Sequence, residues 1–188
     1  VGISGASQRV RSYPHELSGG MRQRCLIAAA IACKPRLLFA DEPTTALDVT
    51  TEAQVLNVLQ QMQEDLHMVV LLISHNLGII ARMCRRVYVM YAVEEATTER
   101  LFDEPAHPYT KGLLSSLPAL HDKGEVLKGI GGQAPDLFHL PQGCRFFSRC
   151  RDGMRICERL EPPTFDLEKG QREACWLYSP ERSASSCI

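Results

Sequence analysis

The sequence predicts an α/β fold over residues 1–117, because helical segments alternate with short apolar runs that end in polar residues. Residues 21–33 are rich in helix-forming Ala, Leu, Ile, Arg and Gln. Ser18 suits the N-cap of this helix, and Pro35 prevents its continuation. The apolar run at 37–40 follows and predicts a buried parallel strand with Asp41 at its carboxyl end.

Two further strands continue the alternation. Residues 68–73 and 86–90 read as strands, and a helix at 77–83 separates them. Residues 51–66 predict a longer helix before the first of these strands. Its apolar stripe has helical spacing and consists of Val55, Leu56, Leu59 and Met62. We therefore expect a largely parallel sheet.

Composition and charge exclude several classes of protein. The chain has 188 residues, of which 45% are hydrophobic and 23% are charged, as in soluble globular proteins. A formal net charge of −1 argues against nucleic-acid binding through bulk electrostatics. The longest apolar run, 25–33, is far shorter than the ~20 residues that span a bilayer. The first residue is Val, and no basic-then-apolar leader follows it, so we expect a fragment.

Four of the eight cysteines crowd into one late segment with the spacing C-x5-C-x6-C-x17-C. Four thiolates at this spacing can surround one metal centre. The spacing lacks the tight C-x2–4-C pair typical of structural zinc and permits a four-cysteine iron–sulfur cluster, so a cluster is favoured and Zn²⁺ is the alternative. Disulfides are disfavoured in a reducing compartment. These candidate ligands are Cys144, Cys150, Cys157 and Cys175.

Basic residues surround these cysteines, namely Arg145, Arg149, Arg151 and Arg155. Their charge could offset that of a thiolate-ligated cluster, and a solvated basic face is the simpler interpretation.

Acidic and histidine side chains follow two of the predicted strands. Asp41 and Glu42 end the first strand, and His75 follows the second. Parallel strands end at one edge of a sheet, so these side chains can face one crevice. There Asp41 could hold Mg²⁺, Glu42 could polarise a water, and His75 could donate to a phosphate oxygen. Taken alone, each of them is more often an ordinary loop residue.

A glycine pair opens the first long helix. Exposed amides and the hydroxyl group at Ser18-Gly19-Gly20 can form an anion cradle, which the helix dipole reinforces. An ordinary N-cap with two loop glycines is the alternative.

Four segments in this order resemble the ATP-binding cassette (ABC) ATPases. They are Leu-Ser-Gly-Gly-Met-Arg-Gln-Arg at 17–24, Leu-Leu-Phe-Ala-Asp-Glu-Pro-Thr at 37–44, Thr-Ala-Leu-Asp at 45–48 and Ile-Ser-His at 73–75. In that family they correspond to the signature motif, the Walker B motif, the D-loop and the switch histidine. The resemblance implies a P-loop NTPase-like three-layer sandwich.

The same resemblance assigns roles to individual residues. Asp41 would serve Mg²⁺, Glu42 would be the catalytic base, and His75 would contact the γ-phosphate of ATP. Asp48 would lie at the interface between two ATPase subunits. The residues that contact the γ-phosphate bound by the opposite subunit would be Ser18, Gly19 and Gly20.

The phosphate loop Gly-x-x-x-x-Gly-Lys-[Ser/Thr] of this family is absent from the sequence, which contains no Gly-Lys dipeptide. We therefore expect that the chain alone hydrolyses no ATP. Two interpretations stay open. The chain is part of an active ATPase, or it is a truncated, non-enzymatic remnant that acts at most as a metal-binding interaction module.

A second resemblance concerns residues after 100. His-Pro-Tyr-Thr at 107–110 and the following Leu113-Leu114 read on their own as a helix that starts at a proline. They resemble the C-terminal extension of the oligopeptide/dipeptide importer ATPases, whose cysteine pattern resembles a [4Fe-4S] site. This extension argues against a third reading, a soluble ABC ATPase of translation or DNA repair.

The resemblance implies an importer for dipeptides, oligopeptides or a related solute such as nickel. The implied partners are a second ATPase subunit, two membrane permease subunits and an extracytoplasmic solute-binding protein, with no nucleic acid. The implied location is the cytoplasmic face of the inner or plasma membrane. We expect a nucleotide-binding part at 1–92, an extension at 93–178 and a flexible tail at 179–188. Val93 directly follows Met-Tyr-Ala at 90–92, which predicts a shortened hairpin.

Overall fold

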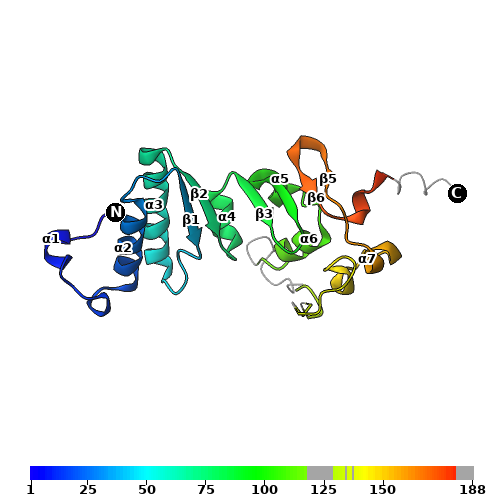
Figure 1. Ribbon diagram of the computed structural model, residues 1–188, viewed down its shortest axis with the longest axis horizontal. Helices are drawn as coiled ribbons and strands as arrows, with labels where there is room; N and C mark the ends of the chain where they lie inside the picture. Colours follow the sequence, from blue (N-terminus) through cyan, green and yellow to red (C-terminus); the bar gives the residue numbers. More distant parts are fainter. Residues whose placement is uncertain (118–128, 134, 137, 181–188) are drawn as a thin grey trace. The chain divides into compact units, whose positions relative to one another are not determined.

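The computed structural model describes residues 1–117, 129–133, 135–136 and 138–180, and it divides into two compact units, Val1–Cys84 and Arg85–Ile188 (Figure 1). The domain boundaries expected after residues 92 and 178 stay predictions. Most of the tail expected at 179–188 lies outside the described residues. No helix in the described ranges has the length and apolar character needed to cross a membrane.

The first unit has the predicted alternation of helices and strands. Its elements are α1 (Ala6–Arg9), a 3₁₀ turn (Pro14–Glu16), α2 (Gly19–Ile31), β1 (Leu37–Asp41), α3 (Val49–Leu66), β2 (Val69–Ile73) and α4 (Leu77–Met83).

Side-chain caps fix where these helices begin. The Ser18 hydroxyl accepts a hydrogen bond from the Met21 backbone N–H, as the sequence predicts. Asp48 caps α3, and Asn76 caps α4 through the Gly78 N–H.

The core of the first unit lies between the two long helices and one face of a parallel strand pair. β1 and β2 pair from Leu37 opposite Val69 to Asp41 opposite Ile73. Figure 1 shows α2 and α3 side by side next to these strands. The predicted stripe of α3 is on the inner side. The buried core residues are Ile27, Leu38, Val55, Leu59 and Met68.

The opposite face of this strand pair is exposed and apolar, which differs from the predicted burial of both faces. Its side chains alternate with the buried ones, as the two-residue period of a strand requires. Phe39 is 64% exposed and Val69 62% exposed. The other apolar residues of this face are Leu37, Leu71 and Ile73. In the described residues, two layers rather than three are therefore present here.

The third predicted strand does not join the parallel sheet. β3 (Arg86–Val89) pairs antiparallel with β4 (Glu94–Thr97), and the second unit has a four-stranded sheet with the order β3-β4-β6-β5. Only residues 90–93 separate β3 from β4, so a hairpin forms at little cost in loop entropy, whereas parallel pairing needs a long crossover.

The rest of the second unit consists of short elements. They are α5 (Thr98–Asp103), α6 (Pro108–Leu114), α7 (Arg155–Arg159), β5 (Phe165–Asp166), β6 (Arg172–Glu173) and 3₁₀ turns at Phe147–Arg149, Glu168–Gly170 and Trp176–Tyr178. The predicted proline-started helix is α6, with His107 as its N-cap.

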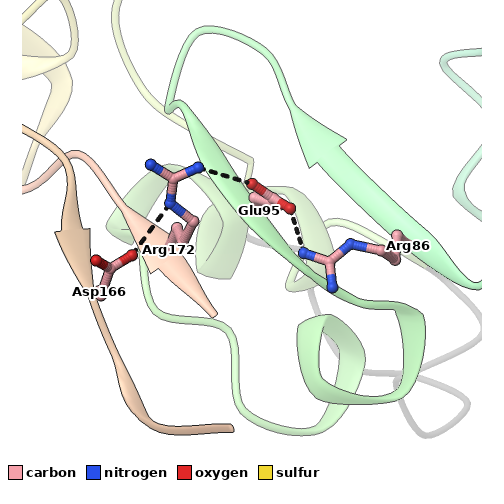
Figure 2. A network of polar contacts seen from close by, with 4 residues as sticks. All are labelled: Arg86, Glu95, Asp166 and Arg172. Atoms are coloured by element: carbon pink, nitrogen blue, oxygen red, sulfur yellow. Dashed lines mark hydrogen bonds and ion pairs between the residues drawn. The ribbon is translucent and has the colours of Figure 1, made fainter. Parts of the chain in front are cut away.

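Alternating charges cross all four strands of this sheet (Figure 2). Arg86 on β3 pairs with Glu95 on β4. Glu95 also lies 3.5 Å from Arg172 on β6, whose Nε donates to Asp166 on β5 at 3.1 Å. This row ties the late strands β5 and β6 to the β3–β4 hairpin.

The hairpin turn between β3 and β4 is as short as the sequence predicts. Tyr91 (φ 76°) and Val93 (φ 50°) both adopt left-handed backbone conformations, which are unfavourable for a β-branched residue such as Val. The Tyr91 hydroxyl donates to the Arg145 carbonyl at 3.0 Å, and its ring packs edge-on against Tyr109 and Phe146. These contacts hold the strained turn in place.

Candidate functional site

The ends of β1 and β2 bring Glu42 and His75 together. The Glu42 N–H donates to the Ile73 carbonyl at 2.9 Å, which continues the pairing of the two strands by one residue. His75 Nδ1 then lies 2.7 Å from Glu42 Oε1. Both side chains are exposed to solvent, and Asp41 at the end of β1 is exposed as well. The expected meeting of these strand ends is thus present in the geometry.

A threonine that sequence reasoning overlooked completes this contact. The Thr45 hydroxyl donates to Glu42 Oε2 at 2.7 Å. The hydrogen bond from Thr45, followed by that from His75, lowers the pKa of Glu42 below its ordinary value. Glu42 itself has φ 46°, a strained conformation of the kind found at functional sites. These two hydrogen bonds hold the Glu42 carboxylate ionised and in one orientation, so it can accept a proton, but the lowered pKa also makes it a weaker base.

The Ser18-Gly19-Gly20 segment lies against the residues around Asp48. A Cβ on Gly19 would approach Leu47 Cδ2 to 3.3 Å, and one on Gly20 would lie only 2.3 Å from Thr51 Cγ2. Thr51 also donates to Asp48 through its backbone N–H at 3.0 Å and its hydroxyl at 2.6 Å, which lowers the pKa of Asp48. Among the described residues, no hydrogen bond joins this group to the Glu42–His75 pair.

The four candidate cysteines share one electrostatic neighbourhood in the second unit. The Cys144 N–H donates to the Cys157 carbonyl at 2.7 Å. This approach requires Gly143, because a Cβ there would lie 2.2 Å from the same carbonyl oxygen. Burial raises the pKa of Cys175 to about 12, with smaller contributions from Glu173 and from the Cys144 and Cys150 thiols. Cys150 in turn interacts with Cys144 and Cys157. All four are free thiols.

The thiols are spread more widely than a zinc site requires. A tetrahedral zinc ion with bonds of ~2.3 Å would hold its sulfurs roughly 3.8 Å apart. Among the described residues, no three of these sulfurs lie within 4.8 Å of one another.

A second trio of possible ligands lies deeper in the same unit. Ligand atoms of His107, Glu173 and Cys175 all lie within 4.8 Å of one another, and all three residues are buried. However, His107 Nδ1 accepts the Tyr109 N–H at 2.9 Å, so the proton of the neutral ring is on Nε2. That Nε2–H lies 3.8 Å from Glu173 Oε1. Since a metal needs an unprotonated nitrogen, this arrangement does not fit a metal ion.

Two buried acids oppose each other across β4 and β6, and sequence reasoning missed both. Glu94 is 1% exposed, and its carboxylate accepts hydrogen bonds from the Ala106 and His107 N–H groups and from the Gln171 amide. Glu173 is 0% exposed, and neither of its oxygens has a hydrogen-bond partner in the described chain. Burial, and then the charge of Glu94, raises the pKa of Glu173 to about 9.

The sequence carries only a weak signal for these acids, because β6 has just two residues and shows no periodic pattern of its own. Glu94-Glu95 and Arg172-Glu173 each place one charged residue on the outer row and one inside. Because neighbouring residues of a strand point to opposite faces, one residue of each pair must face the buried side of the sheet.

Two family descriptions match the sequence. "ABC transporter" matches residues 1–45, and "Oligopeptide/dipeptide transporter, C-terminal region" matches residues 93–157. Among solved structures, cbiO1 from Clostridium perfringens, part of the ABC transporter complex cbiONQ, aligns with 48% of this chain and 37% of that chain. Its sequence identity is 26% and its TM-score 0.42.

Curated relatives match nearly the whole chain. The oligopeptide transport ATP-binding protein AppD of Bacillus subtilis (strain 168) is 46% identical over 99% of this chain and 58% of its own length. The dipeptide transport ATP-binding protein DppD of B. subtilis (strain 168) is 47% identical over 94% of this chain, and OppD of Haemophilus influenzae is 45% identical over 92%. The chain spans about half the length of these relatives. It belongs to the oligopeptide/dipeptide family of ABC transporter ATP-binding proteins.

Proposed function

We propose that this chain is part of the ATP-hydrolysing subunit of an ABC importer for dipeptides, oligopeptides or a related small solute. The contact between His75 and Glu42 at the ends of two parallel strands carries the proposal, because it presents an oriented carboxylate base at the edge of the sheet where ligands bind in α/β folds. The relatives are oligopeptide and dipeptide transport ATP-binding proteins, which supports the substrate class.

The proposed roles follow from the chemistry of each side chain. Asp41, an exposed carboxylate at the end of β1, would hold Mg²⁺, whose charge stabilises the phosphate oxygens of ATP. Glu42 accepts a proton from the attacking water, and His75 keeps that carboxylate oriented and can donate to the γ-phosphate. Ser18, Gly19 and Gly20 would contact the γ-phosphate bound by the opposite subunit, and Asp48 would face that subunit.

The exposed apolar face of β1 and β2 supports the three-layer part of this proposal. Parallel sheets are covered on both faces, and in the described residues only one face of this strand pair is covered. In the proposed assembly, a second ATPase subunit, two permease subunits and an extracytoplasmic solute-binding protein complete the importer. The ATPase would act at the cytoplasmic face of the membrane.

A chimaera tests the proposed activity. The upstream part of B. subtilis AppD, joined to Val1, would provide the phosphate loop that this sequence lacks. We expect ATP hydrolysis that Glu42→Gln abolishes and His75→Ala strongly reduces, with Glu52→Gln, on the first turn of α3, as the matched control. A folded chimaera that hydrolyses no ATP, or one whose activity survives Glu42→Gln, contradicts the proposal.

We also propose that the four late cysteines hold a [4Fe-4S] cluster. Electrostatic interactions among these cysteines place them in one neighbourhood, and their C-x5-C-x6-C-x17-C spacing lacks the tight pair typical of structural zinc, which supports the proposal. Protein purified without oxygen should contain about four irons and four sulfides per chain by this cluster's composition. Cys150→Ser should remove them, and Cys33→Ser, at an exposed cysteine of the first unit, should not. Stoichiometric zinc instead of iron would overturn the assignment.

A further inference from the structure

Thr51 contacts two segments that have separate roles in the proposed function. Its hydroxyl donates to Asp48 Oδ2 at 2.6 Å. Its methyl group fills the space above Gly20, where a Cβ would come within 2.3 Å of Thr51 Cγ2. Thr51 lies in the first turn of α3, Asp48 is the N-cap of that helix, and Gly20 lies in the first turn of α2.

The two contacts of Thr51 depend on one torsion angle. The hydroxyl and the methyl group are attached to the same Cβ, so rotation about χ1 moves both together. A shift of Gly20 towards α3 would push the methyl group away. The hydroxyl would then leave Asp48, and only the Thr51 backbone N–H would still donate to that carboxylate. Conversely, a different position of Asp48 would alter the space available beside Gly20.

We propose that Thr51 is a positioning residue that couples the signature glycine Gly20 to the D-loop aspartate Asp48. This inference rests on the proposed function for its significance, since Gly20 and Asp48 would both face the opposite subunit. Movement of the signature segment on ATP would then be transmitted to Asp48 within the same chain. The coupling itself exists without nucleotide and is measurable in this chain.

The first experiment substitutes Gly20. Ala has a higher helix propensity than Gly, so Gly20→Ala would favour helix α2 if the methyl group of Thr51 did not occupy the space of the new Cβ. We expect G20A to shift the side-chain carboxyl ¹³C signal of Asp48 and to raise the pKa of Asp48 read from it by NMR. In a T51S background, where the hydroxyl stays and the methyl group is gone, G20A should leave both unchanged. Ala29→Gly, at an exposed site on α2, is the control for helix propensity.

The second experiment needs no change at Gly20. Because coupling is reciprocal, the Gly20 backbone amide signal should shift with the same pH midpoint as the Asp48 carboxyl. T51V keeps the shape of Thr51 but removes its hydroxyl, so it should abolish this shift. The proposal is overturned if G20A changes the Asp48 signal and pKa equally in the Thr51 and T51S backgrounds. It is also overturned if the Gly20 amide signal of the unsubstituted chain does not follow the titration of Asp48.

A functional measurement separates this inference from the proposed activity. In the AppD chimaera, T51V should lower the rate of ATP hydrolysis at saturating ATP, and T51S should lower it less. If the chimaera hydrolyses no ATP while the NMR coupling is present, the proposed function fails and the coupling stands. If the chimaera is active and the NMR coupling is absent, the proposed function stands and the coupling fails.

Discussion

Two neighbouring buried acids, Glu94 and Glu173, differ in the hydrogen-bond donors that reach them. Glu94 receives three N–H donors, from the Ala106 and His107 backbones and the Gln171 side chain. Glu173 receives none in the described chain and lies directly opposite Glu94 in the sheet. Burial, and then the charge of Glu94, raises the pKa of Glu173 to about 9, so Glu173 keeps its proton near neutral pH.

The burial of Glu173 makes the second unit sensitive to alkaline pH. Its pKa rises from 4.5 to about 9 on folding, so the folded form binds more protons between these values. The stability contribution of this group is complete below pH 4.5 and is lost as pH rises towards 9. We expect Glu173→Gln to raise the melting temperature at pH 8–9 and to change it little at pH 4.5. Thermal melts at several pH values test this, with the exposed Glu168→Gln as control; equal effects at both ends of the range would refute it.

Thr45 should lower the pKa of Glu42 through its hydrogen bond to that carboxylate. Replacing Thr45 with Val removes the largest cause of the lowered pKa of Glu42 and leaves the contact with His75 in place. We expect the pKa of Glu42, followed by carboxyl ¹³C NMR, to rise, so that Glu42 takes up its proton at a higher pH. Thr164→Val, at an exposed site in the second unit, should have no effect on that signal. An unchanged Glu42 titration in Thr45→Val would contradict this account.

Sequence reasoning reached the residues that carry motifs but not their hydrogen-bond partners. Asp48 and Glu42 stand out by position, whereas Thr51 and Thr45 are ordinary residues in composition and spacing. Their hydroxyl groups act only because α3 begins at Val49 and because Glu42 adopts a left-handed conformation. Such backbone details cannot be read from a pattern of apolar residues.

The helices and strands of the first unit could be predicted from the sequence, but which faces of its strands are buried could not. Alternating burial on β1 and β2 leaves one apolar face exposed in the described residues. A continuous apolar run predicts a strand but does not distinguish one covered face from two.

This exposed face should bind hydrophobic dyes. We expect the chain to enhance 8-anilinonaphthalene-1-sulfonate fluorescence, and Phe39→Ser together with Leu71→Ser to reduce it by at least half. Val49→Ser, at an isolated exposed site on α3, is the matched control. If Val49→Ser reduces the fluorescence as much as the pair on the sheet, the face is not the binding surface.

The charge row across the second sheet predicts unequal effects along its length. Glu95 contacts two arginines, whereas Asp166 contacts one. Glu95→Gln should therefore lower the urea midpoint more than Asp166→Asn, and the difference should shrink in 1 M NaCl because salt screens exposed pairs. Equal losses for the two variants, or a difference that salt leaves unchanged, would show that the row is not electrostatic in origin.

The pairing of this second sheet lay beyond sequence reasoning. β5 and β6 have two residues each, too few to show a periodic pattern. In addition, β4, the partner of β6, lies about 75 residues earlier in the chain.

At the scale of the whole molecule, motif order and local periodicity predicted the family and the longer helices and strands of the first unit. Two features depend on long-range contacts and did not follow from the sequence, namely the exposed face in the first unit and the separate antiparallel sheet in the second. Both concern which element lies beside which, and apolar patterns within one segment carry little information on that.

The late arrival of β6 also has a consequence for synthesis. After β4 leaves the ribosome, about 75 further residues must be made before β6 can pair with it. At about 5–20 residues per second, the free edge of β4 is open for roughly 4 to 15 seconds. During that interval the nascent hairpin offers unpaired backbone groups to other chains, and it is then that we expect a chaperone to be most useful.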